Sequence, residues 1–305
     1  MYKRLELHNH TNESDASITC QELIDLMSEE GVDAFAITDH NTISGHTKIK
    51  QLLEEKKSPV SCIYGMEYTT YYGHILCLNL KEYVPWENIN LHKPELLFQA
   101  AKEKGALTGI AHPFSFGWPF AQGCRFEMNM TDYSSCDFIE IFNNPEPLHQ
   151  VNEPALLLWE KLVLDGNKLA ITCGMDLHGK SSFHGHYATY IEKQDGMDIE
   201  KELEMAIHCQ KTWVSKGPIL QTTIKNNNLC FSLYQTNKPG YIIPLKEDYL
   251  ISLQSKDCKF LCRLTEEIPL SLFGKNSPII IKLYEKADKI ENLVCICPLF
   301  QKHLD

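Results

Sequence analysis

The first two-thirds of the chain alternates short apolar runs with amphipathic helical patterns. Seven runs of five residues have the β-branched and apolar composition typical of strands. They are Arg4–His8, Ala34–Thr38, Val60–Tyr64, His74–Leu78, Leu107–Ala111, Phe138–Phe142 and Leu169–Cys173. Strands that alternate with helices along a sequence usually pair in parallel. The alternation therefore predicts a closed or nearly closed β/α barrel, whose functional residues lie at the carboxyl ends of the strands.

Helix boundary signals separate these runs. Thr19 begins a T-C-Q-E capping box with Glu22, and Gly31 stands where a helix C-terminus favours a left-handed residue. Two further segments open with proline in the first turn and close at glycine, Pro94 to Gly105 and Pro154 to Gly166. The sequence therefore predicts amphipathic helices between the strands.

The pattern changes after Trp213, where β-rich segments with turn signals replace the helices. The expected strands are Thr222–Lys225, Leu229–Leu233, Tyr249–Leu253, Phe260–Leu264, Ile279–Tyr284 and Leu293–Cys297. We therefore predict an α/β chain of two domains. The β/α barrel occupies residues 1–215, and a β-rich, sandwich-like accessory domain occupies residues 216–305.

The bulk composition excludes several classes of protein. A formal net charge of -11 and a pI near 5.6 argue against a nucleic-acid or anionic membrane surface, which needs clustered lysine and arginine. No apolar run approaches the roughly 20 residues of a membrane helix, and Met1 to Leu7 contains no apolar signal core. We therefore expect a cytoplasmic protein that binds a small molecule, and the sequence leaves its oligomeric state open.

The cysteines do not indicate a disulfide framework. The 12 cysteines are scattered through a long chain, and most lie in apolar stretches, which favours buried free thiols. Cys295 and Cys297 form a C-x-C pair, but two thiolates do not complete a tetrahedral zinc site.

Histidines and carboxylates recur near the ends of the strand-like runs. His8 and His10 are two residues apart on a strand, so their side chains leave the same face and can bind one cation together. The full set is His8, His10, Asp15, His40, Glu67, His74, His112, Asp176 and His178. Nine such ligands exceed the three or four of a single zinc site. They predict two or three divalent transition-metal ions, with Zn, Mn and Fe all compatible with nitrogen and oxygen ligands.

These residues stand in motifs that resemble the PHP superfamily, named for polymerase and histidinol phosphatase domains. The matching motifs are His8-Asn9-His10 with Asp15, Thr38-Asp39-His40-Asn41, Gly65-Met66-Glu67, Gly73-His74, Ala111-His112-Pro113 and Gly174-Met175-Asp176-Leu177-His178. The resemblance covers roughly the first 180 residues and implies a distorted seven-stranded β/α barrel with a trinuclear metal site. The Gly65–Thr70 stretch and the appended β-region are most similar to the branch that includes carbaryl hydrolases and phosphoesterases.

The resemblance also implies how the ligands divide among the ions. It assigns one ion to His8, His10, Glu67 and Asp176, a second to Glu67, His74 and His112, and a third to Asp15, His40 and His178. Glu140, within the sixth strand, resembles a residue that orients a ligand imidazole, and a structural ion pair is the alternative role.

The expected function is hydrolysis of a phosphoester on a small molecule. Clustered divalent ions lower the pKa of a bound water and stabilise the charge of the transition state, so a metal-bound hydroxide acts as nucleophile. Consistent with this, the sequence has neither a G-x-S-x-G elbow nor a P-loop pattern.

Three residues are candidates for contacting the substrate. Arg125 lies in the long insertion Phe114–Ser135, and its planar guanidinium suits a phosphate. The insertion also contains Phe114, Phe116, Trp118, Phe120 and Phe126, which either form a lid over the site or pack the loop onto the barrel. His184 and His186 follow His178 closely enough to line the same mouth.

Two other functions stay open on the sequence alone. A carbamate or carboxylic ester hydrolase would use the same hydroxide on a carbonyl and would favour an apolar aromatic pocket. The second alternative, from another class, is a degenerate PHP domain that acts as a binding module. The complete set of nine candidate ligands argues against it.

Overall fold

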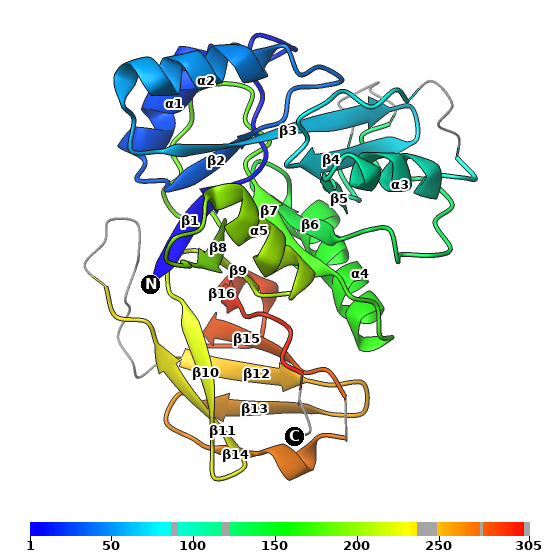
Figure 1. Cartoon of the computed structure of the whole chain (residues 1–305). Coiled ribbons are helices and arrows are strands. Elements are labelled where there is room, and N and C mark those ends of the chain that lie inside the picture. The colour runs from blue at the N-terminus through cyan, green and yellow to red at the C-terminus, as the bar shows by residue number, and fades with distance from the viewer. Residues whose placement is uncertain (87–90, 117–122, 237–248, 275–276, 302–305) are drawn as a thin grey trace.

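A computed structural model describes residues 1–86, 91–116, 123–236, 249–274 and 277–301 (Figure 1). The seven predicted strands are present, with bounds that differ from the prediction by a few residues. They are β1 (Tyr2–Glu6), β2 (Ala34–Ile37), β3 (Ser61–Thr70), β4 (Gly73–Leu78), β5 (Leu107–Ile110), β6 (Phe138–Asn143) and β7 (Ala170–Gly174). Two further strands, β8 (Ala188–Glu192) and β9 (Thr212–Ser215), follow them.

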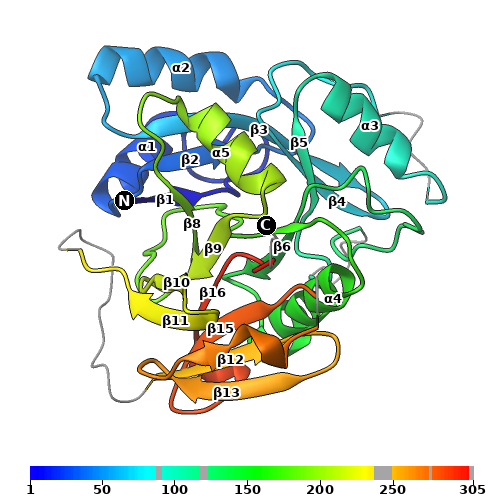
Figure 2. The same cartoon turned by 60° about the horizontal axis from the view of Figure 1, so that its bottom comes forward.

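The α-helices are α1 (Cys20–Glu29), α2 (Gly45–Lys56), α3 (Glu95–Glu103), α4 (Glu153–Leu164) and α5 (Ile199–His208), with short helical turns at Leu148–Asn152, Leu270–Leu272 and Ile290–Asn292. Three of the helices, α1, α3 and α4, begin and end within two residues of the sequence signals. The capping box of α1 is confirmed, since Thr19 accepts from the backbone N–H of Glu22 and the Glu22 side chain accepts from that of Thr19. Figure 2 shows α3 beside β5 and α4 beside β6. None of the helices in the described ranges is long and apolar enough to cross a membrane.

The strands form a mixed sheet, which corrects the expectation of a parallel barrel. The pairs β1–β2, β5–β6 and β6–β7 are parallel, whereas β4 runs antiparallel to both β3 and β5. A closed barrel is not confirmed, because the hydrogen-bonded order of the described strands ends at β7. Threonine hydroxyls bridge the open side instead: Thr189 Oγ1 bonds the backbone N–H and carbonyl of Cys173, and Thr212 Oγ1 donates to the carbonyl of Ile171.

The strands are buried on both faces, as their continuous apolar runs predict. Ala34 and Ala36 of β2 belong to a core cluster that includes Leu203 of α5. Phe35 and Ile37 point the other way and share a cluster with residues of α1 and α2. Helices therefore cover both sides of this part of the sheet and leave its strand ends free for polar side chains.

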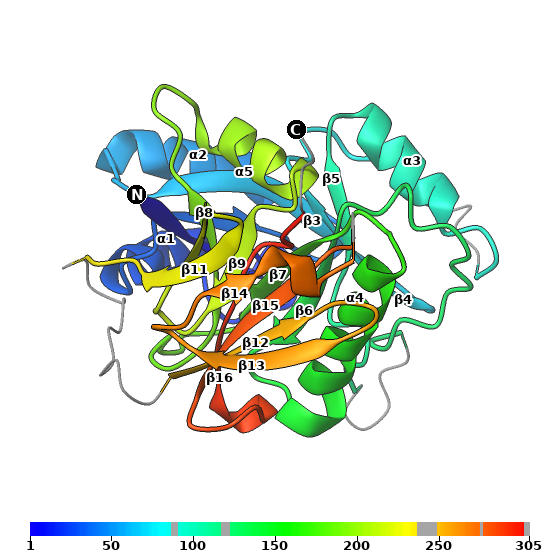
Figure 3. The same ribbon diagram turned by 90° about the horizontal axis from the view of Figure 1, so that it is seen from below.

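The C-terminal segments extend the same sheet. β9 pairs with β16 (Leu293–Ile296), and the sheet continues through β15 (Ile280–Glu285) and β12 (Tyr249–Gln254) to β13 (Lys259–Arg263). A three-stranded sheet of β10 (Leu220–Lys225), β11 (Asn228–Leu233) and β14 (Ile268–Pro269) lies beside these strands and shares a buried core with them (Figure 3). The predicted division after residue 215 falls between β9 and β10, and backbone hydrogen bonds between β9 and β16 cross it.

Candidate metal centre

The nine predicted ligands come together at one edge of the sheet. His8 and His10 follow β1, and His40 follows β2. His112 follows β5, and Asp176 and His178 follow β7. Every one of the nine side chains belongs to at least one group of three or four whose ligand atoms lie within 4.8 Å of one another.

Glu67 and His74 reach this edge by a different route from the one predicted. β3 does not end at Tyr64 but continues to Thr70, so Glu67 lies inside a strand. β3 then turns back into β4, which places His74 near the beginning of its strand. Because β4 runs antiparallel to β5, its beginning lies at the edge where the parallel strands end. The direction of β4 explains how a histidine at a strand start joins histidines at strand ends.

A first group consists of His8, His10, Glu67 and Asp176. Asp176 Oδ1 lies 3.4 Å from His8 Nε2 and 3.0 Å from His10 Nε2. Glu67 Oε2 lies 3.4 Å from both of these nitrogens. Two imidazole nitrogens and two carboxylate oxygens thus face one another. The side chains of His8, His10 and Glu67 are fully buried, and that of Asp176 is 20% exposed.

A second group uses the other oxygen of Glu67. Its Oε1 lies 2.9 Å from His74 Nδ1 and 3.1 Å from His112 Nε2. The carboxylate of Glu67 therefore faces the first group with one oxygen and the second group with the other, which is the arrangement of a bridging ligand.

The third group lies on the open side of the centre. Asp15 Oδ1 is 3.6 Å from His40 Nε2 and 3.3 Å from His178 Nε2, and His10 lies within reach of the same group. The Asp15 side chain is 58% exposed and that of His178 39% exposed, in contrast to the buried ligands of the first group. Solvent and solutes therefore approach the centre from this side.

The charges in the centre shift the pKa values of several members. Burial by itself lowers the pKa of His8, but the carboxylates of Glu140, Glu67 and Asp176 outweigh burial and raise it well above its usual value. Burial is likewise outweighed at His112, where the hydrogen bond to Glu67 and the charge of Asp176 raise the pKa to about 9. Burial opposes the ionised forms of Glu67 and Asp176, yet the surrounding imidazoles hold both pKa values well below the usual range. Positive charge, supplied by protons or by cations, is what stabilises this cluster.

The donor set fits divalent transition-metal ions. His8 Nε2 is buried and makes no hydrogen bond within the described residues, although it faces the oxygens of Glu67 and Asp176. A buried ring nitrogen without a hydrogen-bond partner destabilises the fold unless a proton or a metal ion lies between it and the carboxylate oxygens. Imidazole nitrogens and carboxylate oxygens suit Zn, Mn and Fe alike.

Further polar residues contact the ligands from outside the nine. Glu140 Oε1 lies 3.0 Å from His8 Nδ1, in the position that the sequence suggested for an orienting residue. Asn143 Nδ2 donates to Asp176 Oδ2 over 2.9 Å, and sequence reasoning missed this residue. Asn143 could have been predicted from its position, because it is the last residue of β6 and several of the ligands likewise follow the ends of strands. Asp39 Oδ1 accepts from Thr11 N–H and from Ser14 Oγ, and so fixes the loop that carries Asp15.

None of the three candidate substrate residues belongs to the ligand groups found among the described residues. Arg125 is exposed, and its guanidinium carbon lies 5.5 Å from the ring centroid of Phe114, two residues after His112. His184 is exposed, and neither it nor His186 belongs to any of the ligand groups found among the described residues. Burial and the charge of Lys216 lower the pKa of His186.

The described part of the insertion packs onto the turn between β3 and β4. The backbone N–H of Phe126 donates to the carbonyl of Pro113, and that of Glu127 donates to the carbonyl of Tyr72. A Cβ atom at Gly73 would lie 2.8 Å from the Phe126 ring, so this glycine permits the close contact. Packing onto the strands therefore accounts for Phe126, whereas Phe116 is 43% exposed, and Trp118 and Phe120 lie outside the described residues.

Fold and site together define an α/β protein with a cluster of candidate metal ligands at one edge of its sheet. The family model of the PHP domain matches residues 6–113. An uncharacterised protein of Methanocaldococcus jannaschii is 32% identical over 154 residues, which are 46% of this chain and 81% of that protein. The chain belongs to the PHP superfamily.

Two further comparisons agree with this placement. A phosphoribosyl 1,2-cyclic phosphate 1,2-diphosphodiesterase of Eggerthella lenta is 31% identical over 86 residues, which are 26% of this chain and 32% of that protein. A two-domain protein of Bacteroides vulgatus, described as containing a predicted PHP-like metal-dependent phosphoesterase, has a TM-score of 0.56 at 15% identity. The match covers 98% of this chain and 95% of that one, so the similarity of fold extends through the C-terminal strands.

Proposed function

We propose that this protein is a metal-dependent hydrolase that cleaves a phosphate ester of a small molecule. The observation that carries the proposal is the sharing of Glu67, whose two oxygens face two different groups of imidazoles. Such a bridge is typical of centres with two or more ions, which suit hydrolysis of phosphate esters. The names of the Eggerthella lenta and Bacteroides vulgatus proteins support the same class of reaction.

The residues of the chain have distinct proposed roles. His8, His10, Glu67 and Asp176 would hold one ion, Glu67, His74 and His112 a second, and Asp15, His40 and His178 a third. When bound, such ions lower the pKa of a coordinated water and stabilise the negative charge of the transition state. The exposed third group leaves room for substrate, and Arg125 would neutralise the phosphate from the insertion.

Carbamate or carboxylic ester hydrolysis is the second candidate. The guanidinium of Arg125 already lies over the Phe114 ring, and Phe116 is exposed, so the insertion after His112 presents aromatic side chains as well as a cation. An apolar carbonyl substrate would pack on these rings without requiring the guanidinium.

A substrate screen after metal reconstitution separates the candidates. The protein, loaded with Mn, Zn or Fe, is tested against phosphomonoesters, phosphodiesters, carboxylic esters and carbamates. Cleavage of a phosphate ester supports the proposal, and cleavage of carbamates or carboxylic esters alone replaces it with the second candidate. Metal binding without hydrolysis of any of these four classes supports the alternative of a binding module.

We expect at least two transition-metal ions per chain in the reconstituted protein, because nine ligand side chains converge in overlapping groups. Elemental analysis of protein at known concentration measures this ratio. One ion or none per chain would remove the basis of the proposed mechanism.

A further inference from the structure

Strand β6 contributes none of the nine ligands, yet it directs two buried polar side chains at them. Glu140 is 0% exposed and Asn143 is 2% exposed. We propose that β6 positions the metal ligands of its neighbours, with Glu140 acting on His8 and His112 and Asn143 acting on Asp176. This inference rests on the proposed metal-dependent function and assigns roles to residues outside the ligand set.

Glu140 selects which ring nitrogen of His8 carries hydrogen. Its carboxylate oxygens lie 3.0 and 3.1 Å from His8 Nδ1. An ionised carboxylate only accepts hydrogen bonds, so Nδ1 must be the donor. The lone pair of His8 then lies on Nε2, the buried nitrogen that faces Glu67 and Asp176. Only this tautomer of the neutral ring can bind a cation in the first group.

The same carboxylate holds His112 in an unfavourable backbone conformation. The backbone N–H of His112 donates to Glu140 Oε2 over 3.1 Å. His112 has a φ of 23°, in the left-handed region that residues with a Cβ rarely adopt. One carboxylate thus connects a ligand from each of the first two groups.

A glycine on the neighbouring strand makes room for this contact. A Cβ atom at Gly174 of β7 would lie 2.4 Å from His8 Cβ and 2.7 Å from Glu140 Oε1. Any side chain at this position would push His8 and Glu140 apart. The close approach of His8 to Glu140 therefore depends on the residue type at Gly174.

Asn143 orients the carboxylate of Asp176 by a hydrogen bond to its Oδ2 atom. Asn143 Nδ2 donates to Asp176 Oδ2, which leaves Oδ1 directed at His10 Nε2, 3.0 Å away. Asp176 also has a left-handed backbone, with a φ of 46°. Asn152 holds the backbone of Asn143 in turn, accepting from its N–H over 2.7 Å and donating to its carbonyl over 3.1 Å.

Substitution of Glu140 by glutamine tests the tautomer argument. One amide oxygen cannot replace two carboxylate oxygens, so the amide NH₂ would face either the backbone N–H of His112 or Nδ1 of His8. The His112 N–H cannot accept, so we expect the NH₂ to face His8 and favour its Nε2–H tautomer. Titration of the metal-free protein with Mn²⁺ should show a Kd for the tightest site raised about 10- to 100-fold in Glu140→Gln, and raised in Asn143→Ala as well.

Thr172→Val is the matched control. Thr172 is buried on β7, pairs with Glu140 in register, and directs its hydroxyl at the carbonyl of Ile139 rather than at a ligand. The Thr172→Val variant should bind Mn²⁺ with the same affinity as the wild type. A ¹⁵N NMR spectrum of the metal-free protein, with His8 assigned by substitution and the pH raised until its ring is neutral, should show hydrogen on Nδ1 in the wild type and on Nε2 in Glu140→Gln.

The outcomes separate this inference from the proposed function. Unchanged Mn²⁺ affinity and His8 tautomer in a folded Glu140→Gln variant would overturn the role of Glu140 while leaving the proposed function intact. A wild-type protein that binds no Mn²⁺, Zn²⁺ or Fe²⁺ would overturn both. If Glu140→Gln does not fold, Glu140→Asp keeps the charge and shortens the reach to His8, so it should also weaken Mn²⁺ binding. Full affinity in Glu140→Asp would count against the inference.

Discussion

Glu67 lies close to more of the candidate ligands than any other described residue does. Its Oε1 faces His74 and His112, and its Oε2 faces His8, His10 and His40. A single buried carboxylate therefore belongs to two ligand groups and also contacts His40 of the third. Asp15 differs in both respects, since it is exposed and serves only the third group.

We predict that Glu67→Ala reduces activity more than Asp15→Ala and also lowers metal content more. The first substitution removes the carboxylate shared by two groups, and the second removes a ligand from the solvent side. Metal analysis and kcat/KM measured on the same preparations check this order. Equal loss of activity in the two variants, with equal metal content, would show that the hierarchy is wrong.

Glu6 gives a stability prediction that depends on pH. Burial raises its pKa from 4.5 to about 8, and the hydrogen bond from Met175 N–H only partly offsets this. The folded chain therefore holds the proton more tightly than the unfolded chain does. Stability is fully present below the unfolded pKa and is lost as the pH rises towards 8.

For metal-free protein we expect the free energy of unfolding of the wild type to fall, relative to Glu6→Gln, by up to about 1.4 kcal/mol per pH unit from pH ~5 to ~8. Glutamine keeps an acceptor for Met175 but does not titrate. Urea denaturation of both proteins across this range measures the difference. Parallel pH profiles would show that Glu6 titrates normally in the folded chain.

At the scale of elements, the hairpin of β3 and β4 and the insertion after β5 form one side of the centre. The hairpin supplies Glu67 and His74, and the insertion packs against its turn at Tyr72 and Gly73. The same insertion carries Phe114 and Arg125, and the guanidinium of Arg125 lies over the ring of Phe114. The insertion is therefore the element whose residues should distinguish one substrate from another.

If the substrate is a phosphoester, Arg125→Ala should lower kcat/KM. The loss should correspond to about 2 kcal/mol of transition-state stabilisation, the scale of a charge-assisted hydrogen bond. Metal content should not change, because Arg125 contacts none of the nine ligands in the described structure. Arg125→Lys should recover only part of the loss, since lysine keeps the charge but not the planar fork. An active phosphoesterase whose kcat/KM is unaffected by Arg125→Ala would exclude the arginine clamp.

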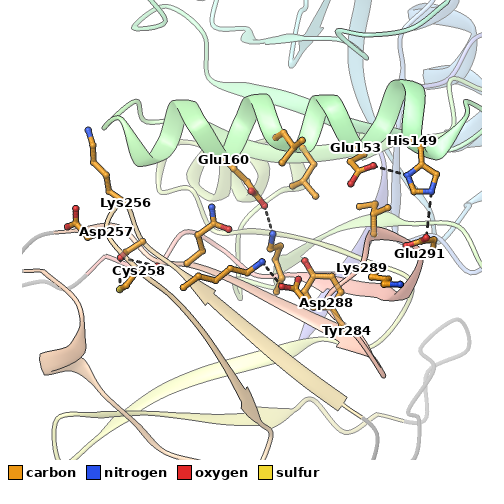
Figure 4. Close-up of a pocket in the computed structure, with 17 residues that line it drawn as sticks. His149, Glu153, Glu160, Lys256, Asp257, Cys258, Tyr284, Asp288, Lys289 and Glu291 are labelled. Carbon is orange, nitrogen blue, oxygen red and sulfur yellow. Dashed lines mark hydrogen bonds and ion pairs between the residues drawn. The ribbon is translucent and has the colours of Figure 1, made fainter.

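At the scale of the whole molecule, ion pairs join the C-terminal strands to α4. A groove of about 830 Å³ runs between α4 and the strands β12 and β15 (Figure 4). Lys282 of β15 donates to Glu160 of α4 within this groove, and each side chain is only 6% exposed. At the other end of α4, His149 contacts Glu153 and Glu291 in more exposed positions.

We predict that Glu160→Ala destabilises the protein by about 3 kcal/mol, because it leaves the ammonium of Lys282 buried without its partner. Glu153→Ala, on the same helix but in an exposed pair, should change stability by less than about 0.5 kcal/mol. The double variant Glu160→Leu with Lys282→Met should recover most of the loss, since no charge is then left buried. Chemical denaturation of the three variants tests the argument, and equal effects of Glu160→Ala and Glu153→Ala would contradict it.

The amino-acid sequence alone determined the features that depend on near neighbours in the chain. The capping box of Thr19 and Glu22 needs only adjacent residues, and it marks the start of α1 correctly. The apolar runs identify the strands for the same reason, and PHP motifs such as His8-Asn9-His10 led to the family. The nine candidate ligands could be selected because their polar side chains interrupt or follow these runs.

Only the tertiary structure decided what depends on pairing between distant segments. β3 continues through Glu67 and β4 runs antiparallel because their backbone groups pair with each other, and this places His74 at the site edge. The sheet stays open at β7, where threonine hydroxyls replace a ladder of backbone hydrogen bonds. Asn143 gained a role only through its contact with Asp176, 33 residues away in the chain. Hydrogen bonds between such distant residues leave no period in the sequence, so the direction of a strand and the partner of a side chain emerge only when the chain is folded.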